Sequence, residues 1–418
     1  MAQTELTCCR NVMLRFAILP VLYGLLAQSA VALSDPGKGG RNGSVSGTTA
    51  LPSRKEVSRA IALSGAYLER ACGPDGKFTY SIDPRSGREN RSYNIVRHAG
   101  AIYALATLNR SQPNRKVVDA MVRAANFMRQ NYIGPGVRAG QLVVWSEPSG
   151  RNSEAELGAT GLGVVALAEV RKVEPKTIPV EQLQSLGRFM LFLQKEDGSF
   201  VHKYRAAIGP VPNKNVLYYP GEAALGFIAL YETDHSREWL VAASKALAYL
   251  VRSRAESTKV PHDHWALIAT ARLLPHCEKD SCPVSRKELL EHATKICNSI
   301  VQRQLRNPAS PLDGAFDPAG RTAPVAARLE GLLAALEFLP NDELRVEVEA
   351  AANRSIAFLL RAQINSGPFV GGMPAALAGR PNASEIRIDY VQHALCAWLR
   401  YLYVLDRQNA NRHARSIQ

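Results

Sequence analysis

The chain has 418 residues, of which 46% are hydrophobic and 21% charged, an ordinary balance for a globular protein with a large core. Its formal net charge of +14 favours acidic partners, such as an anionic polysaccharide or anionic lipid headgroups. The sequence has no zinc-finger spacing, recognition-helix pattern or aromatic RNA-binding motif, so we expect no nucleic-acid partner. It also has no nucleotide-binding loop, and we expect no cofactor.

The first residues have the pattern of an export signal. Arg10 and Arg15 precede an apolar run over 16–26, and the small residues 30–32 fit a cleavage site. We predict a signal peptide over 1–32, a flexible Gly/Ser-rich linker over 33–54 and a tail over 409–418. The protein is then secreted, or periplasmic within the cell envelope. The alternative is a retained N-terminal anchor, and only that would imply membrane association.

From residue 57 onward, apolar residues recur at helical spacing, and no run of alternating strand residues appears. One kind of segment has a charged face and an apolar face, which indicates a helix with one side in water. The predicted exposed helices are Val57–Ala71, Lys116–Tyr132, Val180–Gln194, Trp239–Arg254, Arg286–Leu305 and Glu343–Ile364.

The second kind of segment is rich in small residues and nearly uncharged in its body, which indicates a helix buried on all sides. The predicted buried helices contain His98–Ala106, Gly158–Ala166, Glu222–Leu230, Trp265–Ala271, Glu330–Leu336 and His393–Trp398. The two kinds alternate six times at a period of about 60 residues, as in a repeat protein. We therefore predict an all-α fold over 55–408, an (α/α)6 toroid with inner and outer helix rings. An open α-solenoid is the alternative, and the oligomeric state stays open.

Several predicted exposed helices end in a glutamine or a glycine turn followed by an aromatic residue. The examples are Asp75–Phe78, Gln194–Phe200, Gln304 with Asp313–Phe316, and Gln363 with Gly367–Phe369. Glycine suits the left-handed stop of a helix. These ends resemble the glutamine–aromatic repeat of terpenoid cyclases and their toroidal relatives. The chain from 57 to 406 resembles the wider (α/α)6-toroid superfamily, which includes six-hairpin glycosidases, polysaccharide lyases and sugar epimerases.

The resemblance implies that the N-terminal ends of the inner helices line the open mouth of a central cavity. Those positions are polar and aromatic here, which is typical of a ligand site. Arg97, Glu222 and Arg328 fall at one level of their helices, where a buried ion-pair girdle is the structural alternative. The expected substrate-binding residues are Tyr93, Arg97, His98, Trp145, Glu156, Tyr218, His264, Trp265, Arg328, Arg387 and Tyr390.

Aromatic and charged groups in one cleft suit a polysaccharide or oligosaccharide substrate. The leading hypothesis is glycoside hydrolysis by an acid–base pair of carboxylates. The alternative is a uronate C5-epimerase or lyase that uses Tyr or His and arginine; the segment Leu217–Ala223 resembles a helix start in glucuronyl epimerases. The candidate catalytic residues are Glu222, Asp389, Glu330, Asp263, Tyr219 and His393. A non-catalytic glycan- or partner-binding toroid is a third hypothesis. A terpenoid-cyclase-like enzyme is a fourth, although the sequence has no aspartate-rich motif.

Cys277 and Cys282 flank a short polar loop, and this spacing suits a local disulfide in an oxidising compartment. A metal site is the alternative, because His276 and His292 lie nearby, but the spacing fits no common zinc pattern. His262, Asp263 and His264 also resemble a ligand cluster, although adjacent side chains on an extended turn point apart. We expect no metal.

Overall fold

The computed structural model describes residues 51–90, 92–147, 154–212, 215–277, 282–340, 342–379 and 382–416, with side chains as far as residue 410. These residues belong to the unit Thr48–Gln418. The predicted signal peptide and most of the predicted linker lie outside the described residues. The last helix continues to Ser416, beyond the residue where we ended the toroid domain.

The described residues form six helical hairpins, and the predicted (α/α)6 toroid is confirmed. The outer helices are α1 (Arg54–Ala71), α3 (Arg115–Asn131), α5 (Val180–Leu193), α7 (Arg237–Ser253), α9 (Arg286–Val301) and α11 (Glu343–Ala362). The inner helices are α2 (Ile95–Ser111), α4 (Leu157–Val173), α6 (Tyr219–Asp234), α8 (His264–Leu273), α10 (Thr322–Ala335) and α12 (Ile388–Ser416). A 3-10 turn, η1 (Leu274–His276), extends α8, and α9 ends four residues earlier than predicted.

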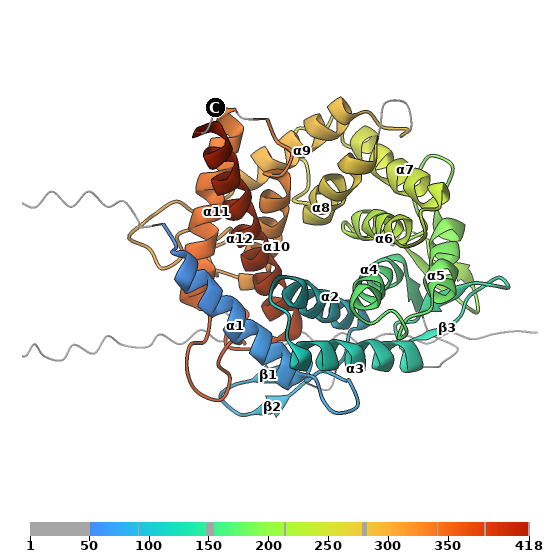
Figure 1. Cartoon of the computed structure of the whole chain (residues 1–418), viewed down its shortest axis with the longest axis horizontal. Coiled ribbons are helices and arrows are strands. Elements are labelled where there is room, and N and C mark those ends of the chain that lie inside the picture. Colours follow the sequence, from blue (N-terminus) through green and yellow to red (C-terminus); the bar gives the residue numbers. More distant parts are fainter. Residues whose placement is uncertain are drawn as a thin grey trace, which may run out of the picture. The chain divides into compact units, whose positions relative to one another are not determined.

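The inner helices close into a ring. Each one packs against the next, and α12 packs against α2, so that no inner helix is left at an open end (Figure 1). Small residues allow this close approach. A Cβ atom on Gly161 of α4 would lie 2.8 Å from the carbonyl oxygen of Glu222 on α6. The open solenoid is therefore excluded for this part of the chain.

Glutamines at the ends of three outer helices join each helix to the next one in the outer ring. The amide nitrogens of Gln194, Gln304 and Gln363 donate to the carbonyls of Ala242, Ala351 and Ala60 over 2.9, 2.8 and 2.9 Å, respectively. The last of these bonds runs from α11 back to α1, so it closes the outer ring. Cys72 takes the same place at the end of α1, with its sulfur 3.4 Å from the carbonyl of Ala120.

A glycine of positive φ follows each of these ends and lies against the next outer helix. A Cβ atom on Gly76, Gly198, Gly314 or Gly371 would come within 2.0–2.2 Å of a carbonyl oxygen of that helix. At the fourth junction the glycine predicted from the sequence is the wrong one. Gly367 has open space around it, whereas Gly371 meets α1, and Met373 stands where the other copies have phenylalanine.

Short strands, which the sequence pattern did not predict, lie in the loops that lead into the inner helices. They are β1 (Ser81–Asp83), β2 (Arg88–Glu89), β3 (Ile133–Pro135), β4 (Leu142–Val144), β5 (Glu154–Glu156), β6 (Lys203–Arg205), β7 (Gly209–Pro210) and β8 (Ile386–Arg387). All pairs are antiparallel, in the orders β2-β1-β8, β3-β4 and β5-β6-β7. Strands of two or three residues are too short to show alternation.

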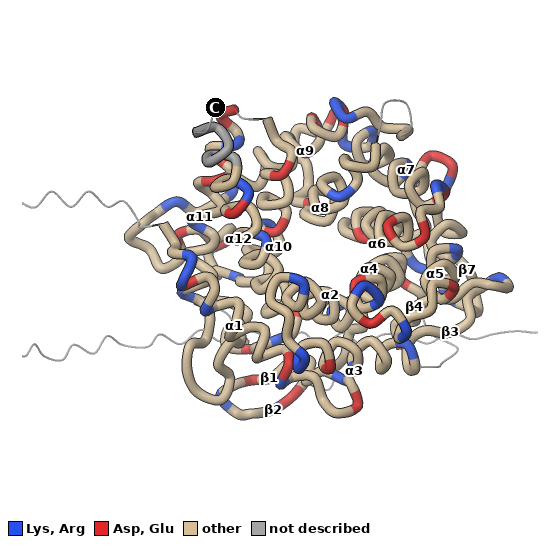
Figure 2. The backbone as a smooth tube through the Cα atoms, viewed as in Figure 1, with Lys and Arg blue, Asp and Glu red and all other residues tan. Residues whose placement is uncertain are grey.

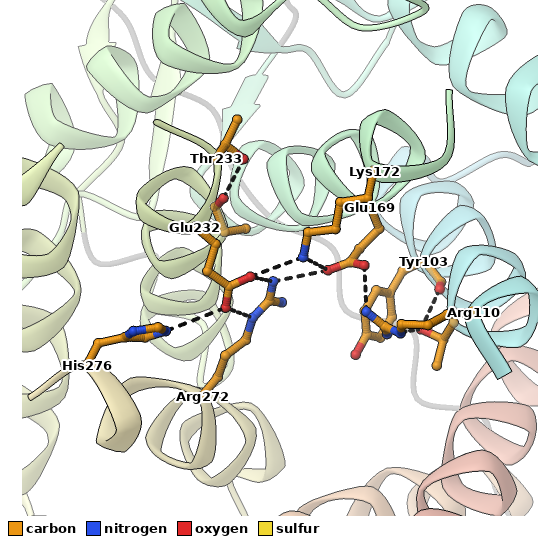
Figure 3. Close-up of polar contacts among 10 residues, drawn as sticks. Tyr103, Arg110, Glu169, Lys172, Glu232, Thr233, Arg272 and His276 are labelled. Carbon is orange, nitrogen blue, oxygen red and sulfur yellow. Dashed lines mark hydrogen bonds and ion pairs between the residues drawn. The ribbon is translucent and has the colours of Figure 1, made fainter. Parts of the chain in front are cut away.

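Because every inner helix follows an outer one, all six inner helices run in the same direction. Their C-terminal ends carry a buried ion network (Figure 3). Glu169 of α4 accepts hydrogen bonds from Arg110 of α2 and Arg272 of α8 at 2.8 and 3.0 Å, and Arg272 also binds Glu232 of α6. Cations suit this end because helix dipoles make it negative. An ion-pair girdle thus exists at the end opposite to Arg97, Glu222 and Arg328.

Closure of the outer ring is testable with two glycines of the same loop. We expect Gly371→Ala to lower the free energy of unfolding by about 1–3 kcal/mol more than Gly367→Ala. Both variants place alanine at positive φ (+88° and +79°), which costs about 1–2 kcal/mol in each. Only at Gly371 does the added methyl group meet the carbonyl oxygen of Leu63 on α1. Urea denaturation measures the difference, and equal losses would contradict a tight α11–α1 closure.

Candidate functional site

A cavity of about 410 Å³ opens at the N-terminal ends of the inner helices. All six inner helices contribute at least one residue to its lining. The polar and aromatic side chains that line it are Arg97, Tyr218, Glu222, His262, His264, Trp265, Arg321, Arg328, Asp389, Gln392 and His393. The N-terminal ends of helices are positive, so a negative charge that develops on a ligand is favoured here.

Two histidines face each other in this cavity. The rings of His264, in the first turn of α8, and His393, on α12, have centroids 5.6 Å apart and planes at 75°. Gly331 of α10 makes room for α8, since a Cβ atom there would lie 2.9 Å from the Cα of His264. Tyr218 and Trp265 flank His264, each with a ring centroid 4.9 Å from it. The two imidazole rings therefore lie in the same part of the cavity, next to the rings of Tyr218 and Trp265.

The surroundings push the two histidines toward opposite protonation states. Burial lowers the pKa of His264 well below its usual value, and neither of its ring nitrogens has a partner among the described residues. Burial also acts to lower the pKa of His393, but the carboxylate of Glu330 outweighs it and raises that pKa. The Nδ1 atom of His393 lies 2.6 Å from a carboxylate oxygen of Glu330. His264 is thus shifted toward the neutral form, which accepts a proton, and His393 toward the protonated form, which donates one.

Glu222 is a buried carboxyl group without a cation beside it. Burial raises its pKa to about 8, and the nearby charges of Asp263 and Glu156 act in the same direction. Its Oε2 atom has no partner among the described residues. Gly158 of α4 leaves the space for it, since a Cβ atom there would lie 2.1 Å from Oε2. Glu222 is therefore a neutral acid at pH 7, able to donate a hydrogen bond.

Asp389 is held by two arginines at the start of α12. Arg387 binds both of its oxygens, at 2.6 and 3.0 Å, and Arg97 of α2 lies 3.2 Å from one of them. The guanidinium of Arg387 stacks over the ring of Tyr390 at 4.3 Å, while Arg97 also bonds the hydroxyl of Tyr80. This group fixes the strand–helix junction, and only Arg97 and Asp389 reach the cavity wall.

Arg328 of α10 lines the same cavity as Glu222. Its guanidinium lies 4.9 Å from the ring centroid of Phe316, the aromatic residue of the third glycine turn. Its Nη1 atom is buried and has no partner among the described residues. Burial lowers the pKa of Arg328 despite the opposing effect of Tyr218. A buried donor without an acceptor is costly, so this group is poised to bind an anionic or carbonyl oxygen.

The remaining residues of the predicted site lie outside the cavity lining. The Tyr93 hydroxyl and the Ala124 carbonyl hold the two nitrogens of His98 at 2.7 and 2.9 Å, in the core between α2 and α3. Trp145 packs on Gly134, and Tyr219 bonds Glu156, which binds Lys203. These residues precede or begin inner helices, but their side chains pack within the strands and helical hairpins and do not line the cavity.

Asp263 and Glu330 were predicted to be catalytic carboxylates, and the geometry gives them supporting positions instead. Asp263 is fully buried, caps α8 by accepting from the Ala266 amide at 3.1 Å, and pairs with Arg254 at 2.8 Å. Glu330 lies behind His393, away from the cavity lining. Three lining residues were missed as binding candidates, namely His262, Gln392 and Arg321. His262 and Gln392 stand next to predicted residues in the sequence, which was the available signal.

Cys277 and Cys282 are bonded in the structure, with Cα atoms 5.7 Å apart. Within the described ranges, no group of three His, Cys, Asp or Glu side chains is placed to hold a metal ion. No helix there is long and apolar enough to cross a membrane.

The fold, but not the sequence, has known counterparts. No family model and no curated protein matches the chain. A D-mannose isomerase superposes with a TM-score of 0.64 at 11% identity, over 83% of this chain and 97% of that one. A cellobiose 2-epimerase from Spirochaeta thermophila gives 0.63 at 15%, over 84% and 97%. An inactive variant of an α-1,6-mannanase from Salegentibacter, bound to mannotriose, gives 0.55 at 14%, over 83% and 99%.

These matches confirm that the chain has the (α/α)6 toroid fold. The three structures are of a sugar isomerase, a sugar epimerase and a glycoside hydrolase. The fold alone does not select among such reactions.

The burial of Glu222 predicts a pH-dependent cost in stability. The pKa of this carboxyl group is 4.5 in the unfolded chain and about 8 in the folded one. Between pH 4.5 and 8 the folded chain therefore keeps the proton and the unfolded chain loses it. As a result, the free energy of unfolding falls as pH rises through this window. We expect Glu222→Gln, which cannot ionise, to be more stable than the wild type at pH 8 by a few kcal/mol and similar at pH 4. Denaturation at both pH values measures this, with the exposed Glu291→Gln as control. A pH-independent difference would contradict the assignment.

Proposed function

We propose that this protein is a sugar epimerase or isomerase that moves a proton at a carbon next to a carbonyl group, with His264 and His393 as the acid–base pair. The proposal is supported by the geometry of two imidazole rings whose centroids lie 5.6 Å apart in one cavity, with the carboxylate of Glu330 bonded to only one of them. Their surroundings shift the two pKa values in opposite directions. General acid–base catalysis needs such a pair within reach of one substrate.

The chemistry balances with these residues. A neutral His264 takes the proton from the carbon, and the electron pair of the broken C–H bond moves into the carbonyl group. The oxygen then receives a proton from His393, which gives an enediol. Return of a proton to the opposite face of the same carbon yields the epimer, and return to the neighbouring carbon yields the isomer. In either case the hydroxyl group that becomes the new carbonyl gives its proton to His393, which is neutral after its earlier donation. Arg328, which has an unbonded donor, stabilises the negative charge that develops on the oxygen.

A sugar suits the rest of the cavity. The ring of Tyr218, which is 37% exposed, offers a face for a pyranose, and the protonated carboxyl of Glu222 can bond a hydroxyl group. The isomerase and the epimerase among the similar structures support this class of reaction. A uronate C5-epimerase or lyase would use the same proton transfer, with Arg328 on the uronate carboxylate.

Glycoside hydrolysis is the second candidate, favoured by the raised pKa of Glu222, which suits a general acid. Its partner carboxylate is hard to supply, because Asp389 is bound by two arginines and Asp263 is buried against Arg254. The inactive mannanase variant carries replacements of two consecutive aspartates, and this chain has no such pair. Proton transfer by the histidines therefore fits the geometry better.

The proposal is tested by incubating the purified protein in D2O with aldoses, cello- and manno-oligosaccharides, and uronic acids. We expect deuterium at the carbon next to the carbonyl, read by NMR, together with the epimer or isomer. His264→Ala and His393→Ala should each lose about 100-fold or more of this exchange. The control is His235→Asn, which changes an exposed histidine of positive φ beyond α6.

New reducing ends without deuterium would replace the proposal by hydrolysis, and full activity in either histidine variant would overturn the residue assignment. Binding without any turnover would favour a glycan-binding toroid.

Glu330 gives a second test through the pH profile. His393 acts as the acid, so activity falls as pH rises through its pKa, which Glu330 raises. Without that carboxylate, burial, which lowers the pKa, is the largest remaining influence on His393. We expect Glu330→Gln to move the alkaline limb of the kcat/KM profile to lower pH. Glu337→Gln, which removes the partner of Arg400 at the far end of α10, should leave the limb in place. An unmoved limb in Glu330→Gln would contradict the role of this pair.

A further inference from the structure

A second cleft adjoins the central cavity. It has a volume of about 880 Å³ and is lined by the loop before α8, the C-terminal half of α9 and one residue of α10. Tyr218, His262 and Arg328 line both spaces, so the two are continuous at these side chains. Both volumes lie in the range of small-molecule sites, and a chain of sugars that has one unit in the cavity would pass its next unit into this cleft.

The cleft is basic. Its lining includes Lys259, Lys295, Arg303 and Arg328 and no carboxylate. The carboxylate that most affects the pKa of Arg328 is Asp317, which is already paired with Arg321 at 3.0 Å. Lys295 donates to the carbonyl of Ala255 rather than to an acid. A concave surface with one sign of charge raises the local concentration of the opposite ion.

Stabilisation of helix C-termini by cations explains only part of the positive charge in this cleft. Lys295 and Arg303 lie near the C-terminal end of α9, where a cation is favoured by the helix dipole. Lys259 lies in the loop before α8, and Arg328 lies inside α10, so neither benefits from that end. The buried Nη1 atom of Arg328, which has no partner among the described residues, points independently to a ligand with an acceptor oxygen.

The contacts of His262 fit the same view. Its Nε2 atom donates to the carbonyl and hydroxyl oxygens of Ser299, at 3.0 and 3.1 Å, which holds the ring between the two spaces. Burial lowers its pKa, and the charges of Arg328 and Arg303 act in the same direction. The ring therefore stays neutral and the cationic character of the cleft rests on the lysines and arginines.

We infer that this cleft binds an anionic group, the carboxylate of a uronic acid or a sulfate or phosphate ester, on the sugar next to the reacting one. The inference rests on the proposed function in so far as the reacting sugar occupies the central cavity. It makes the substrate an acidic oligosaccharide, whereas the names of the similar isomerase and epimerase refer to the neutral sugars mannose and cellobiose.

Binding, measured by calorimetry without turnover, tests the inference. The probes are a disaccharide that carries one glucuronic acid unit, its methyl ester, and versions with a sulfate or a phosphate ester. We expect the wild type to bind at least one anionic probe about tenfold more tightly than the ester, with a preference that weakens at high salt. The double variant Lys259→Ala/Arg303→Ala should lose most of this preference.

The matched control is Arg286→Ala/Lys287→Ala, which also removes one lysine and one arginine, but from the exposed first turn of α9, outside the cleft. This variant should keep the preference for the anionic probe. Equal binding of acid and ester by the wild type, no binding of any anionic probe, or a preference that survives in the cleft variant would each overturn the inference. The anionic probe that binds identifies whether the cleft recognises a carboxylate, a sulfate ester or a phosphate ester. His264→Ala should retain the preference while losing exchange, so the cleft and the proposed reaction can fail separately.

Discussion

Six helices that are apolar on every side can be sheltered only if they close into a ring, and the rest of the structure follows from this constraint. Small residues let neighbouring inner helices approach until backbone meets backbone, as Gly161 does with Glu222. The outer ring must close together with the inner one. The hydrogen bond from Gln363 to Ala60 and the contact of Gly371 with Leu63 join the last outer helix to the first. Neither end of the chain segment needs a cap.

The common direction of the inner helices gives the ring two chemically different ends. Figure 2 marks the charged residues along the backbone, with Lys and Arg in blue and Asp and Glu in red. At the C-terminal end, arginines complement the negative helix termini and are fully paired with carboxylates such as Glu169 and Glu232. At the N-terminal end, the positive termini surround a cavity in which several polar atoms have no protein partner among the residues that the structure describes. The first end is built for stability and the second for a ligand, because buried polar groups without partners are retained at a cost.

The helices and their alternation between exposed and buried could be predicted from the sequence, since periodicity and composition depend directly on burial. The sequence also predicted that polar groups gather at the N-terminal ends of the inner helices. The direction of individual side chains could not. Adjacent residues such as Asp263 and His264 diverge at the start of α8, where Asp263 turns outward to Arg254 and His264 turns into the cavity. Gly367 and Gly371 are equally plausible by pattern, and only the position of α1 decides between them.

Pairing, rather than residue type, decides which acid or base is free to react. Of the carboxylates that the sequence nominated, Asp389, Asp263 and Glu330 each have a cationic partner, which leaves Glu222 with a raised pKa. Buried atoms without a partner in the described part of the chain occur on five residues, and three of these, Glu222, His264 and Arg328, line one cavity. A carboxyl acid, a neutral imidazole and a free guanidinium can together donate to a hydroxyl group, accept a proton from carbon and stabilise an oxyanion. A carboxylate held by arginine can do none of these as well, which is why we propose the histidine pair, rather than two carboxylates, as the acid and base.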